Sequence, residues 1–210
     1  MDTQISLNVF TDISLHMYIT ISGAHGIGKT TLSELIARKN NWEYLPEAID
    51  ITLPPPKFGP KSDQKVAGQY WFMMQVIAKE NKLRSMGMNS VVIVDRSWQD
   101  ILIYSKTLLN ETDYNIYKGI ISELPKKIPD LQIILDADTS VIAERIKNRN
   151  RGNISEWGED DIEYLDKIVT EYRKYYDDFK DILPVKKVDA SGTLEQTYKK
   201  TKNVIEKYLV

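Results

Sequence analysis

Five short runs rich in apolar, β-branched or aromatic residues recur along the chain, and each is followed by a longer segment of helical periodicity. The run at residues 91–94 (VVIV) is apolar throughout, as is typical of a strand buried on both faces of a sheet. The predicted strands cover residues 18–22, 41–45, 91–94, 131–135 and 184–188.

The segments between these strands carry apolar residues three or four positions apart, which is the spacing of one helix face. They predict helices at residues 31–40, 63–86, 98–109, 113–124, 139–148, 159–180 and 193–209. Prolines between Pro54 and Pro60 exclude regular structure from the intervening loop. The alternation predicts an α/β fold in three layers, with a five-stranded parallel sheet and helices on both of its faces.

The first predicted strand runs into residues 23–30 (GAHGIGKT), which fit the P-loop pattern of Gly, four residues, Gly, Lys, then Ser or Thr. Glycines let such a loop turn so that its N–H groups close around phosphate oxygens. Lys29 would reach the β and γ phosphates, and Thr30 would ligate the Mg²⁺ between them. The predicted phosphate-binding residues are Gly23, Ala24, His25, Gly26, Ile27, Gly28, Lys29, Thr30 and Thr31.

Size and composition narrow the class of protein. A chain of 210 residues with 42% apolar content can bury one substantial core, so one domain at residues 17–210 is expected, preceded by a poorly ordered extension at residues 1–16. The net charge of −2 argues against a nucleic-acid partner. The absence of cysteine excludes disulfides, thiolate metal sites and a cysteine nucleophile. Because the sequence shows neither a signal peptide nor a membrane-spanning run, a cytoplasmic protein without a membrane partner is expected.

Charged residues follow the predicted second and third strands, at the edge where an α/β sheet gathers its ligands. Glu47 could take a proton from an attacking hydroxyl, or it could be a solvated charge. Asp95 is placed as the acidic partner of the P-loop cation, and Arg96 beside it would meet a phosphoryl group. The alternative for this pair is an N-capping Asp with a surface Arg.

Three arginines lie within seven residues at the end of the helix predicted at residues 139–148. Arg145, Arg149 and Arg151 lead into a stretch that contains glycine and asparagine. With a P-loop in the same chain, this pattern favours a lid at about residues 149–158 that brings guanidinium groups onto a transferring phosphoryl group. A solvated basic face would show the same charges.

The helix predicted at residues 63–86 contains the run YWFMMQ at residues 70–75. An aromatic and methionine cluster of this kind is usually part of a core. Gln75 is the exception, because its amide offers a donor and an acceptor that suit the edge of a nucleobase. Tyr70 or Trp71 could stack on the face of the same base.

Together these motifs resemble the deoxynucleoside kinase family, within the thymidylate-kinase-like group of P-loop kinases, over residues 18–209. The W-E-x-x-P-E signature of that family is matched at residues 42–47 (WEYLPE), and its D-R-S motif at residues 95–97. Its lid pattern of Arg, three residues, Arg, one residue, Arg is matched by Arg145, Arg149 and Arg151.

The resemblance implies that Glu47 is the general base and that Gln75 pairs with the nucleobase. It places Asp161, in a stretch similar to the E-L-x-Y-L segment of the family, near the sugar 3′ hydroxyl. Asp100 is the candidate for a further base contact, but it lies one residue short of the family's position, so the base preference stays open. Relatives commonly form dimers, and the helices at residues 98–124 would supply either a dimer face or part of the core.

The motifs and the resemblance together predict ATP-dependent phosphorylation of a nucleoside 5′ hydroxyl, with Mg²⁺ between Thr30, Asp95 and the phosphates. Three alternatives remain: a thymidylate-type monophosphate kinase, a kinase of another small molecule such as nicotinamide riboside, and a P-loop ATPase or nucleotide-sensing module. Arg149 and Arg151 would also contact ATP. The side chains expected to stabilise the moving phosphoryl group are Lys29, Arg96, Arg145 and Arg149.

Overall fold

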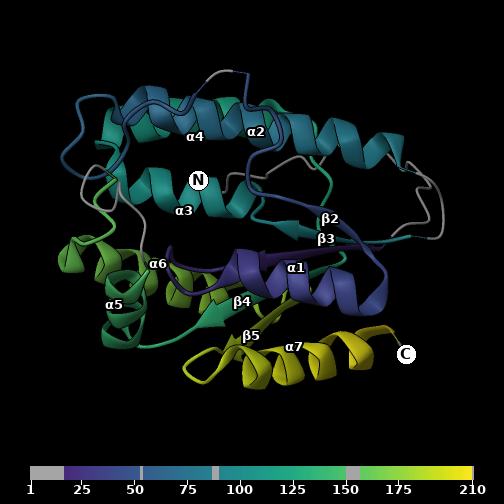
Figure 1. Cartoon of the computed structure of the whole chain (residues 1–210). Helices are drawn as coiled ribbons and strands as arrows, with labels where there is room; N and C mark the ends of the chain where they lie inside the picture. The colour runs from purple at the N-terminus through teal and green to yellow at the C-terminus, as the bar shows by residue number, and fades with distance from the viewer. Residues whose placement is uncertain (1–16, 53, 87–89, 150–156, 210) are drawn as a thin grey trace.

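The structure is a computed structural model that describes residues 17–209 apart from positions 53, 87–89 and 150–156 (Figure 1). The expected extension at residues 1–16 and most of the expected lid lie outside the described residues. The described strands are β1 (Met17–Ser22), β2 (Glu43–Leu45), β3 (Val91–Asp95), β4 (Leu131–Asp136) and β5 (Val185–Asp189). They form one sheet in the order β2-β3-β1-β4-β5, and each neighbouring pair is parallel.

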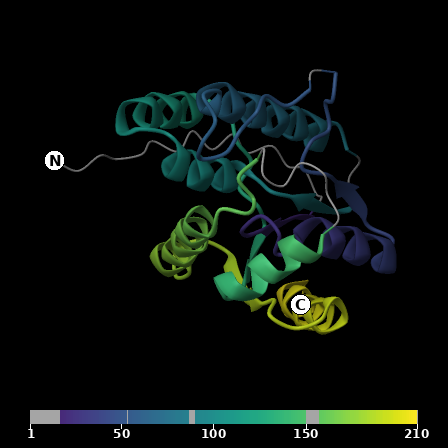
Figure 2. The ribbon, with the colours of Figure 1, turned by 60° about the vertical axis from the view of Figure 1, so that its left-hand side comes forward.

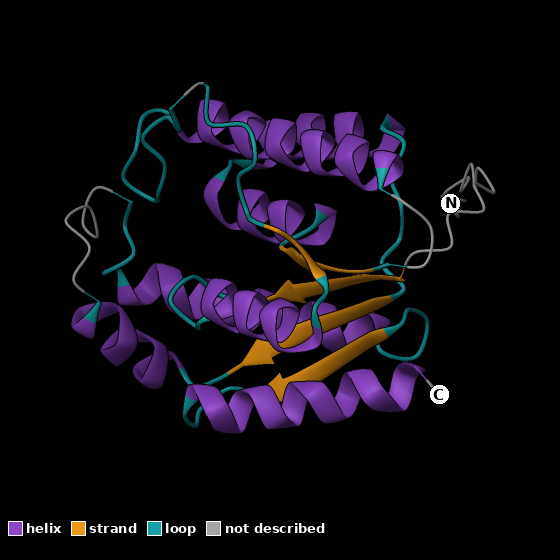
Figure 3. Cartoon of the chain, turned by 45° about the vertical axis from the view of Figure 1, so that its right-hand side comes forward, coloured by secondary structure: helices purple, strands orange, loops and turns teal. Residues whose placement is uncertain are grey.

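Helices follow the strands in the chain and cover both faces of the sheet. α1 and α7 pack on one face, and α6 packs against β4 and β5 on the other, beside α3 (Figure 2). α2 and α4 pack against α3 on the side away from α6 (Figure 3). The predicted α/β fold is therefore confirmed. The helices are α1 (Lys29–Asn40), α2 (Lys65–Ser85), α3 (Trp98–Leu108), α4 (Glu111–Glu123), α5 (Thr139–Asn148), α6 (Ile162–Phe179) and α7 (Leu194–Leu209).

β1 is the centre of both the sheet and the core. Its residues Ile19 and Ile21 are fully buried. Ile19 pairs in register with Ile93 of β3 on one side and with Leu131 of β4 on the other. Because helices cover both faces, every position of the strand except Met17 is buried, which explains why the sequence reads as one continuous run and not as an alternation.

Several element boundaries differ by a few residues from the sequence prediction, and two of these differences have identifiable reasons. β2 begins at Glu43 and not at residue 41, because Asn41 takes a left-handed conformation (φ 55°) at the end of α1. α6 begins at Ile162 and not at residue 159, because the Asp161 side chain accepts the Tyr164 N–H and caps the helix there.

The strand order brings the carboxyl ends of β1 and β3 together. Ile21 pairs in register with Asp95, and the Arg96 N–H donates to the Ile21 carbonyl at 3.2 Å. The chain leaves β1 toward one edge of the sheet and leaves β3 toward the other, which makes this the switch point where α/β sheets bind ligands. The P-loop and the Asp95–Arg96 turn are therefore neighbours.

The two helices considered for a dimer face differ in what they expose. α3 buries Ile101 and Ile103, whereas α4 exposes Ile116 by 55% and Ile120 by 38%. Only α4 thus presents apolar side chains outward, and a homodimer through it stays a prediction. None of the described helices has the length and apolar character that crossing a membrane requires.

Candidate active site

The P-loop joins β1 to α1 at the carboxyl edge of the sheet. Gly23, Gly26 and Gly28 have φ values of 140°, 77° and 106°, in the region that L side chains rarely adopt. At Gly23 a Cβ atom would also lie 2.9 Å from the Leu135 carbonyl oxygen, so the position requires glycine. α1 begins at Lys29 directly after the loop, so the unpaired N–H groups of its first turn add to an anion site.

Lys29 lies inside this loop and not in solvent. Its side chain is buried, and its Nζ donates to the Ala24 carbonyl at 2.9 Å. Burial, followed by the nearby charge of Arg96, lowers the pKa of Lys29 to about 8. The loop backbone thus holds the ammonium where it would meet the phosphates of a bound triphosphate.

Thr30 and Asp95 form the candidate metal site. The Thr30 hydroxyl donates to Asp95 Oδ2 at 2.6 Å, and Asp95 Oδ1 is buried without a hydrogen-bond partner in the described part of the chain. Burial, followed by the charge of Glu47, raises the pKa of Asp95. A buried carboxylate oxygen beside a hydroxyl is a donor set that fits Mg²⁺. The described residues hold no group of three or more His, Cys, Asp or Glu side chains that could bind a metal ion.

Arg96 and Glu47 form an ion pair beside the P-loop. Arg96 Nε lies 2.5 Å from Glu47 Oε1, as a close charge contact and not as an aligned hydrogen bond. Burial alone would lower the pKa of Arg96, but Glu47 and then Tyr104 raise it well above its usual range. Arg96 also has a φ of 65°, an uncommon backbone conformation for a residue with a side chain. The structure therefore brings together two of the predicted catalytic residues.

An aromatic cluster behind the P-loop was not predicted from the sequence. The Arg96 guanidinium lies over the Tyr104 ring at 4.5 Å, and His25 stacks on Tyr164 at 5.4 Å. Tyr104 is on α3 and Tyr164 is on α6, so the aromatic rings join elements that are distant in sequence. The only sequence signal was the presence of these tyrosines at helix positions, which core packing would explain equally well.

The Gln75 amide is bonded to the protein backbone in the structure, and its contact with a nucleobase stays a prediction. Its Oε1 accepts the N–H groups of Ile49 and Asp50 at 3.0 and 2.9 Å, and its Nε2 donates to the Asp50 carbonyl at 2.6 Å. Gln75 is also 3% exposed. The amide therefore holds the loop that follows Glu47.

Asp100 lies in the core of the structure, and its contact with a nucleobase stays a prediction. Its carboxylate is fully buried and accepts from the Ser22 hydroxyl at 2.8 Å, the Ser97 N–H at 2.8 Å and the Tyr172 hydroxyl at 2.6 Å. Asp100 is the third residue of α3, and its bond to Ser97 closes a capping box.

Arg145 is bonded to backbone carbonyls in the structure. Its guanidinium donates to the Ile27 carbonyl at 3.1 Å and to the Ala190 and Gly192 carbonyls at 2.7 Å each. The side chain thus joins α5 and the P-loop to the turn after β5, and its contact with the phosphoryl group stays a prediction. Arg149 follows α5, close enough to lower the pKa of His25, whereas Arg151 lies outside the described residues.

Three other predicted substrate residues make local contacts. Tyr70 packs edge-on against Tyr117, and Trp71 packs edge-on against Phe72. Asp161 caps α6, and its Oδ2 lies 3.8 Å from Lys61 Nζ. These contacts account for the residues as parts of the fold, and their contact with a nucleoside stays a prediction.

The loop that follows Glu47 also reaches the end of the predicted lid. The Phe58 ring stacks on the Trp157 ring at 5.1 Å. Gly59 has a φ of 122°, and a Cβ atom there would lie 2.6 Å from the Trp157 carbonyl oxygen. This close approach requires glycine at position 59. It connects the loop that follows Glu47 with the described end of the predicted lid.

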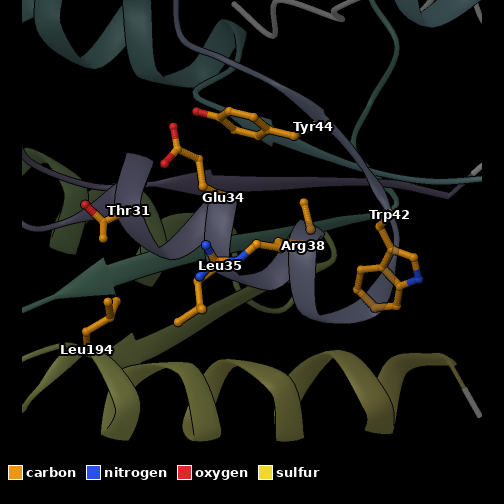
Figure 4. Close-up of a pocket in the computed structure, with 8 residues that line it drawn as sticks. Thr31, Glu34, Leu35, Arg38, Trp42, Tyr44 and Leu194 are labelled. Atoms are coloured by element: carbon orange, nitrogen blue, oxygen red, sulfur yellow. The ribbon is translucent and has the colours of Figure 1, made fainter.

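A groove of about 360 Å³ lies along the outer face of α1, between β2 and the start of α7 (Figure 4). The exposed Thr31 side chain lines this groove, so a contact between Thr31 and phosphate would come from its backbone. In Figure 4 the Tyr44 hydroxyl points to the side where the Glu34 carboxylate lies. The lining residues are Thr31, Glu34, Leu35, Ala37, Arg38, Trp42, Tyr44 and Leu194.

A triphosphate-binding loop on this sheet, with a carboxylate and an arginine facing each other beside it, is the arrangement of a P-loop kinase. The sequence model of one such family, "Deoxynucleoside kinase", matches residues 19–209. The chain belongs to the deoxynucleoside kinase family. It is thus a nucleoside kinase by family, and the predicted resemblance and enzyme class are confirmed.

Similar proteins fall into two groups. A probable thymidylate kinase of Archaeoglobus fulgidus is 29% identical over 92% of this chain and 96% of its own. A deoxyguanosine kinase of Lactobacillus johnsonii is 26% identical over 77% of this chain and 77% of its own. The solved structure of a deoxyadenosine kinase from M. mycoides with bound dATP has a TM-score of 0.77 and 22% identity, and it covers 90% of this chain and 100% of that chain. The last likeness concerns the fold.

Proposed function

We propose that the protein transfers the γ phosphoryl group of ATP to the 5′ hydroxyl of a deoxynucleoside. The observation that carries this proposal is the Glu47–Arg96 ion pair beside the P-loop. A hydroxyl acceptor must lose a proton as it attacks, whereas a phosphate acceptor is already an anion, so a strand-end carboxylate is useful chiefly to the first.

In this mechanism Glu47 accepts the proton of the 5′ hydroxyl. Arg96 orients the carboxylate before the reaction, and it stabilises the negative charge on the transferring group together with Lys29. Thr30 and Asp95 would hold Mg²⁺, which neutralises charge on the β and γ phosphates when bound. Arg149, at the end of α5, is the remaining described arginine that we assign to the phosphates.

The acceptor side is assigned to the space beside the loop that follows Glu47. Tyr70 and Trp71 on α2 are the proposed contacts for the base, and Asp161 is the proposed contact for the sugar. The Gln75 amide is left out of this set because it binds the backbone of the loop.

The first experiment replaces Glu47 by Gln, which keeps the shape of the side chain and removes its basicity. Turnover of the best deoxynucleoside is expected to fall by about two to four powers of ten, because the general base is lost. ATP binding, measured by calorimetry, is expected to persist. Glu43→Gln is the matched control, since Glu43 is exposed on β2, the short strand that ends just before Glu47. Near-normal turnover in Glu47→Gln would contradict the proposal.

A thymidylate-type kinase is the second candidate, and the names of the relatives favour it. An assay of ADP release from ATP in the presence of Mg²⁺ distinguishes the two candidate functions. The acceptor is each deoxynucleoside in turn, then thymidine monophosphate, and a control contains no acceptor. Stimulation by deoxynucleosides supports the proposal. Stimulation by the monophosphate alone supports the second candidate, and equal release without an acceptor would mean an ATPase.

A further inference from the structure

Lys79 is a buried cation that the mechanism above does not use. It lies on α2, one turn after Gln75, and its side chain is 2% exposed. Lysine is almost never buried to this extent unless its ammonium is paired. The partners of Lys79 are two backbone carbonyl oxygens, those of Asp95 at 2.7 Å and Arg96 at 3.0 Å.

These two carbonyls belong to the turn that carries the candidate metal ligand and the candidate catalytic arginine. Arg96 has a φ of 65° there, a conformation that persists in L residues only where the surroundings enforce it. One ammonium that binds two successive carbonyls supplies such enforcement, because it fixes the directions of both peptide groups. The Arg96 N–H, bonded to Ile21, fixes the other side of the turn.

Gln75 and Lys79 act on the two sides of the same ion pair. The Gln75 amide binds the backbone at Ile49 and Asp50, just beyond Glu47, while Lys79 binds the backbone at Arg96. Both side chains are buried on one face of α2. The helix therefore sets the positions of the carboxylate and the guanidinium relative to each other.

We propose that Lys79 is a positioning residue for phosphoryl transfer and acts through Arg96, by holding the left-handed Asp95–Arg96 turn so that the guanidinium faces Glu47. This inference rests on the proposed function. Lys79 itself touches neither substrate in this proposal, since both of its bonds go to backbone oxygens.

The test replaces Lys79 by Met, which has an unbranched side chain without a donor. The kcat for deoxynucleoside phosphorylation is expected to fall between about 10-fold and about 100-fold, because small displacements of catalytic groups are costly. The KM for ATP is expected to stay within about twofold, because the P-loop is untouched. In an Arg96→Ala background Lys79→Met should lower kcat by less than about threefold, because the residue through which Lys79 acts is gone.

Leu83→Ala is the matched control. Leu83 lies one turn further along α2, is equally buried and belongs to a core cluster with Tyr18, Leu45, Val92 and Val94. Its side chain has no donor for the carbonyls of the turn. It should lower stability and leave kcat unchanged at temperatures where the variant is folded. The proposal is overturned if Leu83→Ala lowers kcat as much as Lys79→Met does. It is also overturned if Lys79→Met lowers kcat by the same factor in the wild type and in the Arg96→Ala background.

A second readout does not depend on catalysis. Amide hydrogen exchange at Arg96 should become at least about tenfold faster in Lys79→Met relative to amides of β4, since the turn loses its clamp. Unchanged exchange would overturn the proposal even if no nucleoside is phosphorylated, so this failure is distinguishable from a failure of the proposed function. If Lys79→Met does not fold, Lys79→Gln, which keeps a donor, is measured in the same two ways.

Discussion

Arg96 combines a candidate catalytic side chain with a strained backbone conformation. Its guanidinium is held between the Glu47 carboxylate and the Tyr104 ring, but its backbone lies in the left-handed region. Backbone strain of this kind is stored at functional sites and is compensated by the surrounding structure. Here the compensating contacts are the Lys79 ammonium and the Ile21 carbonyl.

The strain at Arg96 can be measured by a pair of variants. Arg96→Gly and Arg96→Ala both remove the guanidinium, and they differ in the Cβ atom that makes a positive φ costly. Arg96→Gly is expected to be more stable than Arg96→Ala by about 1 kcal/mol, while both lose most of the kinase activity. Urea denaturation of the two variants measures the difference. Equal stabilities would mean that the turn relaxes once the side chain is removed.

Among the elements, α5 matters because one of its side chains connects two loops that are far apart in the sequence. Arg145 reaches the P-loop at Ile27 and the turn after β5 at Ala190 and Gly192. A guanidinium can serve three carbonyls in different directions, whereas an ammonium acts as a compact point charge. The position therefore favours arginine for its shape as well as its charge.

Arg145→Lys should show this difference. The free energy of unfolding is expected to fall by about 1.5 kcal/mol, because hydrogen bonds from a charged donor are lost. The KM for ATP should rise, since the P-loop loses a support. Lys147→Gln, a change at an exposed position of the same helix, is the control. A variant as stable as the wild type would show that lysine bridges both loops.

The elements of the fold were largely predictable from the sequence, whereas the partners of buried polar groups were not. The apolar runs and the P-loop spacing give the strands, the helices and the position of Lys29 because these are local patterns. Asp100 is bonded to Tyr172, and Arg145 to Ala190, across separations that no local pattern encodes. Gln75 shows the same limit, because its amide chemistry suits a nucleobase and a peptide backbone equally well.

The stability of the whole molecule should depend on pH through His25. Burial, followed by the charges of Lys29 and Arg96, lowers the pKa of His25 to about 3. The unfolded chain binds a proton on this side chain near pH 6.5, whereas the folded chain does not. The contribution of His25 to the free energy of unfolding is therefore fully present above pH 6.5 and is lost as the pH falls toward 3.

His25→Asn removes this titration. Between pH 7 and pH 5 the wild type is expected to lose about 2 kcal/mol more of its free energy of unfolding than the variant loses. Urea denaturation at both pH values gives the comparison, and the contributions of all other groups cancel between the two proteins. Equal losses would mean that His25 is accessible to protons in the folded protein.

Of the described strands, β1 is the first to leave the ribosome, and both of its neighbours in the sheet, β3 and β4, are made after it. β2 follows it in the chain but pairs with β3, and β1 itself lies between β3 and β4. Until β3 emerges, the nascent chain carries an apolar strand with two open edges, which is the kind of segment that chaperones protect during translation. Because β3 is both the partner of the P-loop strand and the strand that carries Asp95, a nascent chain gains the two parts of its candidate nucleotide site together only after β3 has been made.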